Sequence, residues 1–450
     1  MTAAGSDGLF QFNWHNTGTG IMTRWRWILT RMTRRLWVRA TLIGLLGVAA
    51  AILAAVVERF VPWELPGSIG AKSVDAILNI IASSMLAVTT FSLSVMTSAY
   101  GSATSNVTPR ATTLLIEDRV TQNVLSTFIG SFLFSIVGIV VLKTGAYGDR
   151  GRVILFIVTI GIIVLIVVAL LRWIDHLTRL GRVGETTDRV EQAARDAIEQ
   201  RLKEPYLGGR RLDDPARTMA GRGTALTADV TGYVQHIDMA ALSRCCETLD
   251  ADIFVMLNPG AFVYPDSVLA RIGTHRVPGE DEVLDEARTA FSIGTGRSFD
   301  QDPRFGLVVM SEIGSRALSP AVNDPGTAID VIGRTTRLLS LWAQGGPQDA
   351  AEEIAHRRVH VAPLDTEDLF EDAFMLMARD GAGLIEVQLR IQKALQALAR
   401  MGDDAFRAAA RKQARLAHER AEVALPLDAD RTRLRDLVRD DADARPPAVP

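Results

Sequence analysis

The sequence predicts a membrane protein with a transmembrane domain of four α-helices, followed by a cytoplasmic α+β domain that holds a small β-module and C-terminal helices. Three observations predict this fold class. Four apolar runs before about residue 175 reach the roughly 20 residues that a helix needs to cross a bilayer. Arginines gather before the first run and after the last. Beyond the last run, amphipathic helical patterns alternate with short β-branched segments bounded by turn residues.

Changes in composition divide the chain into segments. Six are expected, in this order: a basic cytoplasmic N-terminal segment (1–35), the four-helix transmembrane domain (36–172), an amphipathic connecting helix (173–204), the cytoplasmic α+β domain (205–345), a C-terminal helical region (346–438) and a disordered tail (439–450). The tail is polar and rich in proline, so we expect it not to fold alone.

The basic residues around the apolar runs predict the orientation. The runs are Leu36–Val57, Val74–Tyr100, Val124–Leu142 and Val153–Leu171. Six arginines lie at the N-terminal side of the first run, five before it and Arg39 within its first four residues, and four follow the last run, whereas the first loop carries only Arg59 and Lys72. Three basic residues in the third loop weaken this difference without reversing it. The positive-inside rule therefore predicts a multi-pass inner-membrane protein with both termini in the cytoplasm.

Small and polar residues recur in the second apolar run at steps of three or four, which places them on one helical face. They are Asn79, Ser83, Ala87, Thr90, Ser94, Thr97 and Gly101. Such a face allows close packing of helices with hydrogen bonds between them. It can equally line a water-filled path, and both roles are compatible in an oligomer. Asp75 is the only carboxylate within the four runs, which disfavours an ion-coupled pump and leaves a passive pore.

The region after residue 205 contains short strands and helices. Asp238 is expected to cap a helix that begins at Met239. The stretch Asn258–Gly273 resembles a hairpin of barrel-sandwich modules and is interpreted as part of a compact β-module. The stretch "EDEVLDEARTAFSIG", residues 280–294, is interpreted as one helix, with Phe291 on its apolar face.

The stretch "RALSPAVNDPGTAID", Arg316–Asp330, predicts a corner between two helices. Pro320 cannot continue the preceding helix, and Asp324 before Pro325 is typical of an N-cap followed by proline at the first helical position. Glu312 and Arg316 are four residues apart and are expected to pair. The corner explains most of these residues. A second interpretation is an anion or partner site formed by Arg316, Asn323 and Asp324 beside a helix N-terminus.

Several stretches together resemble one family. They are "RALSPAVNDPGTA", "SNVTPRATTLLIEDRVTQNVLSTFIGSFLFS" (Ser105–Ser135), "TGYVQHID" and "DQDPRFGLVVMSEI". Over most of residues 40–345 the chain is similar to the bacterial membrane-protein family catalogued as domain of unknown function 2254. The resemblance implies a membrane-protein fold and no established activity.

We expect no enzyme activity, because no catalytic constellation is evident in the sequence. The stretch Ser292–Ser298 lacks the lysine of a phosphate-binding P-loop. His356 and His360 fall on one face of a strand, but no third ligand is evident, so neither a metal nor another cofactor is expected. The net charge of −3 disfavours nucleic acid as a partner, and the adjacent Cys245 and Cys246 suit a reduced pair.

These observations predict an oligomeric passive channel or pore, lined by the polar face of the second run and gated by the cytoplasmic domain. Its partners would be the lipid bilayer, further copies of the chain and a small ion or solute. The alternative is a membrane-anchored sensor or scaffold whose cytoplasmic domain binds a small anion or a protein partner.

Overall fold

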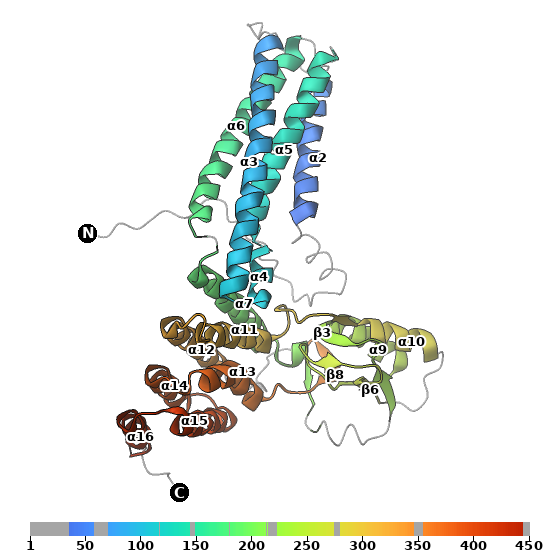
Figure 1. Ribbon diagram of the computed structural model, residues 1–450. Coiled ribbons are helices and arrows are strands. Elements are labelled where there is room, and N and C mark those ends of the chain that lie inside the picture. Colours follow the sequence, from blue (N-terminus) through green and yellow to red (C-terminus); the bar gives the residue numbers. More distant parts are fainter. Residues whose placement is uncertain are drawn as a thin grey trace, which may run out of the picture.

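Figure 1 shows a computed structural model in which a bundle of long helices stands on a region of shorter helices and strands. The structure describes residues 36–57, 71–116, 118–144, 149–179, 181–212, 214, 223–273, 280–345 and 354–443. The predicted N-terminal segment 1–35 and the last seven residues of the predicted tail lie outside these residues. From α7 onward we call the chain the soluble region.

The bundle contains four helices, α2 (Leu36–Val57), α3 (Ala71–Asn106), α5 (Arg119–Lys143) and α6 (Asp149–Leu177). α5 is central and packs against the other three. Within the described residues, three stretches are long and apolar enough to cross a membrane: Ser73–Ser105, Val120–Lys143 and Gly151–Leu177. Within the described residues of α2, Ala40–Ala50 forms a shorter apolar helix. The structure thus gives three candidate spans, and the fourth predicted span is not confirmed.

Glycine allows the close approach of α2 to α5. A Cβ atom added at Gly47 would lie 2.8 Å from the backbone oxygen of Gly130. A Cβ added at Gly130 would lie 2.8 Å from Cγ2 of Ile43. Small residues at this crossing let the two backbones meet, as is common between membrane helices.

α3 is longer than the predicted run Val74–Tyr100. Its 36 residues correspond to about 54 Å, whereas the hydrocarbon core of a bilayer is about 30 Å thick. The lower end of α3 leads through the short helix α4 (Pro109–Ile116) towards the soluble region (Figure 1). One continuous helix therefore connects the bundle to the region below it.

Six helices of the soluble region share one hydrophobic core. These helices are α7 (Val183–Lys203), α11 (Pro303–Ala317), α12 (Pro325–Gln344), α13 (Thr366–Asp380), α14 (Ile385–Leu398) and α15 (Asp404–Ala424). Val107 and Ala111, at the foot of α3 and in α4, are fully buried in the same core. α16 (Asp428–Asp443) packs on α14 and α15, so residues 439–443 are helical where the sequence suggested a disordered tail.

The strands form two sheets with their own core. They are β1 (Gly209–Arg211, preceded by the 3₁₀ turn Pro205–Gly208), β2 (Thr224–Thr227), β3 (Gly232–Ile237), β4 (Ile253–Val255), β5 (Phe262–Val263), β6 (Val268–Ile272), β7 (Phe291–Gly294) and β8 (His356–Val361). The larger sheet has the order β1-β8-β4-β6-β2 and the smaller one β5-β3-β7. β8 lies between β1 and β4, although α11 and α12 precede it in the chain. The β-module is therefore completed from beyond residue 345.

Asn258–Gly273 lies in the β-module as expected, but its strands do not pair like the hairpin that it resembles, because β5 pairs with β3 while β6 pairs with β2 and β4 in the other sheet. The helix expected over 280–294 ends at Thr289, and Phe291 begins β7, which pairs with β3. In both cases a long-range strand partner decides the structure, which local sequence patterns do not report. The helix α9 (Met239–Leu249) does begin as expected, with the Asp238 carboxylate accepting the N–H of Ala241.

Candidate functional site

The small and polar face of α3 is exposed along its whole length. Asn79, Ser83, Ala87, Thr90, Ser94, Thr97 and Gly101 all lie on the surface of this chain. The opposite face is buried against α5 and α6, with Val74, Leu78 and Ser92 inaccessible. This polar face therefore does not pack against another helix of the same chain. We call these seven exposed residues the α3 polar stripe.

The polar groups of the stripe bond to their own helix. The hydroxyls of Ser83 and Thr97 donate to the backbone oxygens of Asn79 and Leu93, both at 2.9 Å. Thr90 does the same to Ala87 at 2.9 Å. Their bonding capacity is partly met without a neighbour, and the oxygens remain able to accept from water or another chain.

Large apolar side chains flank the stripe on both sides. At about 3.6 residues per turn, Leu86 and Leu93 fall on one side and Ile80 and Phe91 on the other. Each is between 49% and 65% exposed. The bilayer accounts for these apolar flanks, because lipid tails solvate them well, but it is a poor solvent for the hydroxyls between them.

The corner after α11 has the predicted form. α11 ends at Ala317 and α12 begins at Pro325, with the Asp324 carboxylate accepting the N–H of Thr327 at 3.0 Å. Asn323 has a φ of 50°, in the left-handed region that asparagine tolerates better than most residues. This turn connects α11 to α12, and the two helices pack against each other.

Glu312 does not pair with Arg316 as expected. Its carboxylate instead accepts from the hydroxyl of Thr108 at 3.0 Å and forms an ion pair with Arg110, both at the α3–α4 junction. In sequence, 204 residues separate Thr108 from Glu312. This cross-element contact, which we call the α3–α11 latch, joins two of the stretches that carry the family resemblance.

An open cleft of about 590 Å³ lies beside the latch. Its lining residues are Val107, Thr108, Pro109, Glu312, Ser315, Arg316, Leu318, Ser319, Pro320 and Asp380. Asp380 accepts from the hydroxyl of Ser315 and pairs with Arg379 at 2.6 Å. Burial raises the pKa of Asp380, but these two partners outweigh it and hold the pKa below its ordinary value.

The three residues of the predicted anion site do not surround one cavity. Arg316 is exposed and lines the cleft. Asn323 and Asp324 are exposed in the turn, and they are not among the lining residues. The Asp324 carboxylate already occupies the N-terminus of α12, and its bonds to Thr327 lower its pKa. Arg316 is therefore the member of the set that faces a space large enough for a ligand.

A second polar cluster, which the sequence did not reveal, fixes the lower end of the bundle. Asp118, almost buried, caps α5 through the N–H of Thr121 at 2.8 Å. Its carboxylate also lies 3.0 Å from Nε2 of His176 on α6 and 2.7 Å from Nη1 of Arg189 on α7. Burial raises the pKa of Asp118, but the contacts with His176, Thr121 and Arg189 outweigh it and leave the pKa far below its ordinary value. The sequence could have shown that Asp118 caps α5, because Thr121 follows it by three residues. It could not have shown the contacts of Asp118 with His176 and Arg189, which lie 58 and 71 residues away.

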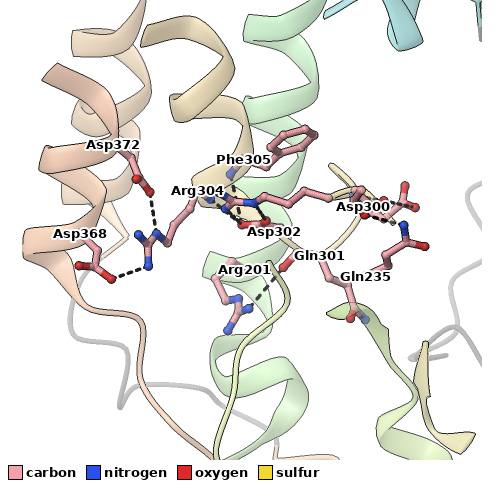
Figure 2. Close-up of polar contacts among 12 residues, drawn as sticks. Arg201, Gln235, Asp300, Gln301, Asp302, Arg304, Phe305, Asp368 and Asp372 are labelled. Carbon is pink, nitrogen blue, oxygen red and sulfur yellow. Dashed lines mark hydrogen bonds and ion pairs between the residues drawn. The ribbon is translucent and has the colours of Figure 1, made fainter. Parts of the chain in front are cut away.

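Figure 2 shows a third network, between the β-module and the helices. Asp302 caps α11 and receives two bonds from Arg297, at 2.7 and 3.0 Å. Burial raises the pKa of Asp302 despite this partner. Arg201, buried on α7, donates to Asn258 and to the backbone of Gln301, and burial lowers its pKa to about 10. These groups are engaged with one another and join the two cores.

Among the described residues, no group of three or more histidine, cysteine or acidic side chains could hold a metal ion. His360 lies 3.3 Å from the carboxylate of Asp252 and stacks on Phe254, while His356 is buried on the same strand. Cys245 and Cys246 are buried free thiols, and burial raises the pKa of each to about 11.

Residues 33–397 match the model of a family described as predicted membrane protein (DUF2254). Uncharacterised proteins of Mycobacterium bovis and Mycobacterium tuberculosis are each 25% identical over 355 residues, which is 75% of this chain and 66% of each relative. The match thus spans slightly less than two thirds of their length. No solved structure matches the chain.

Proposed function

This chain belongs to the family of predicted membrane proteins (DUF2254), and we propose that it forms an oligomeric, passive channel of the bacterial inner membrane. In this proposal α2 is a fourth span, both termini and the soluble region are cytoplasmic, and copies of the chain meet around the α3 polar stripe. The permeant species is a small ion or solute. The proposal assigns the chain no reaction, no cofactor and no nucleic-acid partner.

The observation that carries this proposal is the exposure of the stripe between apolar flanks. Seven small or polar residues face outward over more than 20 positions of a helix long enough to span a bilayer. Exposed to lipid, their polar groups would lack water. Around a central axis, the same groups would face a water-filled path while Leu86, Leu93, Ile80 and Phe91 contact neighbouring copies or lipid.

The latch supports gating by the soluble region. α3 carries the stripe, and the junction just below it is held to α11 by Thr108, Arg110 and Glu312. A shift of α11 would therefore move the lower end of the helix that lines the path. Rigid helices that hold two arrangements of one contact are a common means of such coupling.

Flux through liposomes containing the purified protein tests the channel. We expect Thr90→Leu and Ser94→Leu to reduce single-channel conductance while assembly, followed by size-exclusion chromatography, stays intact. Phe91→Leu is the matched control, because it changes an exposed α3 side chain outside the stripe. Equal conductance in all three variants, or no openings from assembled wild-type protein, would contradict the proposal.

The alternative function is a membrane-anchored sensor or scaffold. The cleft beside the latch favours it, because Arg316 faces a volume within the usual range of small-molecule sites. A sensor predicts that a bound ligand changes the stability of the protein even where no flux is measurable.

A further inference from the structure

We infer that the cleft beside the α3–α11 latch is a binding site for an organic phosphate, either a solute or a lipid headgroup, which competes with Glu312 for Arg110. This inference deepens the proposed function, since it rests on the soluble region acting on α3, and it names the effector class. Its basis is the balance of charge at the cleft, the nature of its lining and the position of the latch.

The cleft is lined by two carboxylates, Glu312 and Asp380, and by the guanidinium of Arg316, and each carboxylate is paired with an arginine outside the lining. Arg110 pairs with Glu312, and Arg379 pairs with Asp380. Arg316 lines the same cleft, and among the described residues it forms no ion pair. One guanidinium is therefore left over. A guanidinium binds phosphate oxygens in a bidentate manner, which makes a phosphate the best-matched anion for it.

Three hydroxyls line the cleft close to this charge. Those of Thr108 and Ser315 donate to Glu312 and Asp380, and the third belongs to Ser319. Phosphate accepts several hydrogen bonds at once, and serine and threonine hydroxyls are frequent partners. The site thus offers the charged fork of Arg316 and the Ser319 hydroxyl as a neutral donor, and the Thr108 hydroxyl becomes available once Glu312 is displaced.

Part of the lining is apolar, and the volume exceeds what inorganic phosphate needs. Val107, Pro109, Leu318 and Pro320 contribute carbon surface to a cleft of about 590 Å³. Small-molecule sites typically combine such surface with a few polar groups. The ligand class is therefore an organic phosphate, with the phosphate at Arg316 and the organic part on the apolar lining.

The latch explains how binding would act. The Glu312 carboxylate now sits at the start of α4, where it accepts from Thr108 and pairs with Arg110, whose side chain is 57% exposed. A dianionic phosphate between Arg316 and Arg110 would take the arginine from Glu312, because two negative charges compete with one. Breaking this pair would loosen α3 from α11.

Isothermal titration of the full-length protein in phosphatidylcholine nanodiscs tests the inference, with inorganic phosphate, phenyl phosphate and dihexanoyl phosphatidic acid as probes. Wild-type protein should bind phenyl phosphate more tightly than inorganic phosphate, because of the apolar lining. Arg316→Gln should weaken binding about tenfold, as expected for the loss of a charge-assisted bond. Arg390→Gln, an exposed arginine on α14 outside the cleft, is the matched control and should bind normally.

Glu312→Gln tests the competition. It frees Arg110 and removes a negative charge, so phenyl phosphate should bind several-fold more tightly. Unchanged or weaker binding in this variant, or wild-type affinity in Arg316→Gln, would overturn the inference, as would the absence of binding at millimolar concentrations of every probe.

The probes also separate the source of the phosphate. Preference for phosphatidic acid assigns the site to a lipid headgroup, and preference for phenyl phosphate assigns it to a soluble solute. Both keep the inference. Binding without any flux would overturn the channel alone, whereas flux without binding would overturn the effector site alone.

Discussion

The α3 polar stripe and the Asp118 cluster both place polar side chains at the membrane bundle, but they differ in how those groups are satisfied. Thr90 and its neighbours in the stripe are exposed and bond within their own helix. Asp118 is almost buried and bonds to three other elements through Thr121, His176 and Arg189. The stripe residues can therefore face water, lipid or another copy of the chain without losing their hydrogen bonds. The Asp118 cluster instead holds α5, α6 and α7 in one arrangement.

Removal of the buried carboxylate should have the largest effect. Asp118→Ala deletes the cap of α5 and leaves Arg189 without its shortest ion pair, so we expect a loss of about 3–5 kcal/mol of stability. Urea unfolding in detergent followed by circular dichroism measures it. Asp175→Ala is the control, because its pair with Arg179 is exposed at both side chains and should contribute less than about 1 kcal/mol. Equal losses of stability in the two variants would contradict the claim that the buried carboxylate of Asp118 contributes more than the exposed one of Asp175.

Glycine substitutions should have an intermediate effect that depends on the region. In Gly306→Ala the new Cβ would lie 2.2 Å from Cβ of Ala194, where α11 packs on α7, and we expect a loss of about 1–3 kcal/mol. Gly101→Ala in the stripe meets nothing within 4 Å and should be neutral or more stable by up to about 1 kcal/mol. Adding Ala194→Gly to Gly306→Ala should recover part of the loss in the same unfolding assay.

Acid should weaken the cluster. The pKa of Asp118 lies below its ordinary 3.8 in the folded protein, so the unfolded chain takes up the proton at higher pH. The stability from this group is therefore fully present above about pH 5 and is lost as the pH falls below about 4. Melting temperatures between pH 6 and pH 3 should fall more steeply for wild type than for Asp118→Asn. Parallel curves would show that Asp118 is not the group that responds.

The smallest effect is expected in the stripe itself. Thr90→Ala removes a hydroxyl that bonds within its own helix at an exposed position, so stability should change by less than about 0.5 kcal/mol. A loss above 2 kcal/mol in detergent-solubilised single chains would show that this side chain does pack within the chain.

The sequence allowed prediction of features that depend on neighbours within about one helical turn. The stripe, the cap at Asp324 and the corner at Pro320 follow from local spacing and side-chain chemistry. Contacts across the chain could not be predicted this way. Glu312 has Arg316 four residues away, yet it pairs with Arg110, because folding brings the α3–α4 junction to that face of α11.

The pairing of β7 with β3 could not be predicted from the sequence for the same reason. Phe291 and its neighbours continue a helical pattern, but β3 offers them a ladder of hydrogen bonds. The first predicted run, by contrast, is helical over its whole length as α2.

Cross-linking between copies tests most directly whether α3 polar stripes face one another. Ser94→Cys would be introduced into a Cys245→Ala, Cys246→Ala background, and the protein in liposomes treated with a short bifunctional thiol reagent. Ile157→Cys, at an exposed position of α6, serves as the comparison. The account predicts covalent oligomers from Ser94→Cys and monomers from Ile157→Cys. Monomers from Ser94→Cys, together with oligomers from Ile157→Cys, would place the contact between copies on α6 and contradict it.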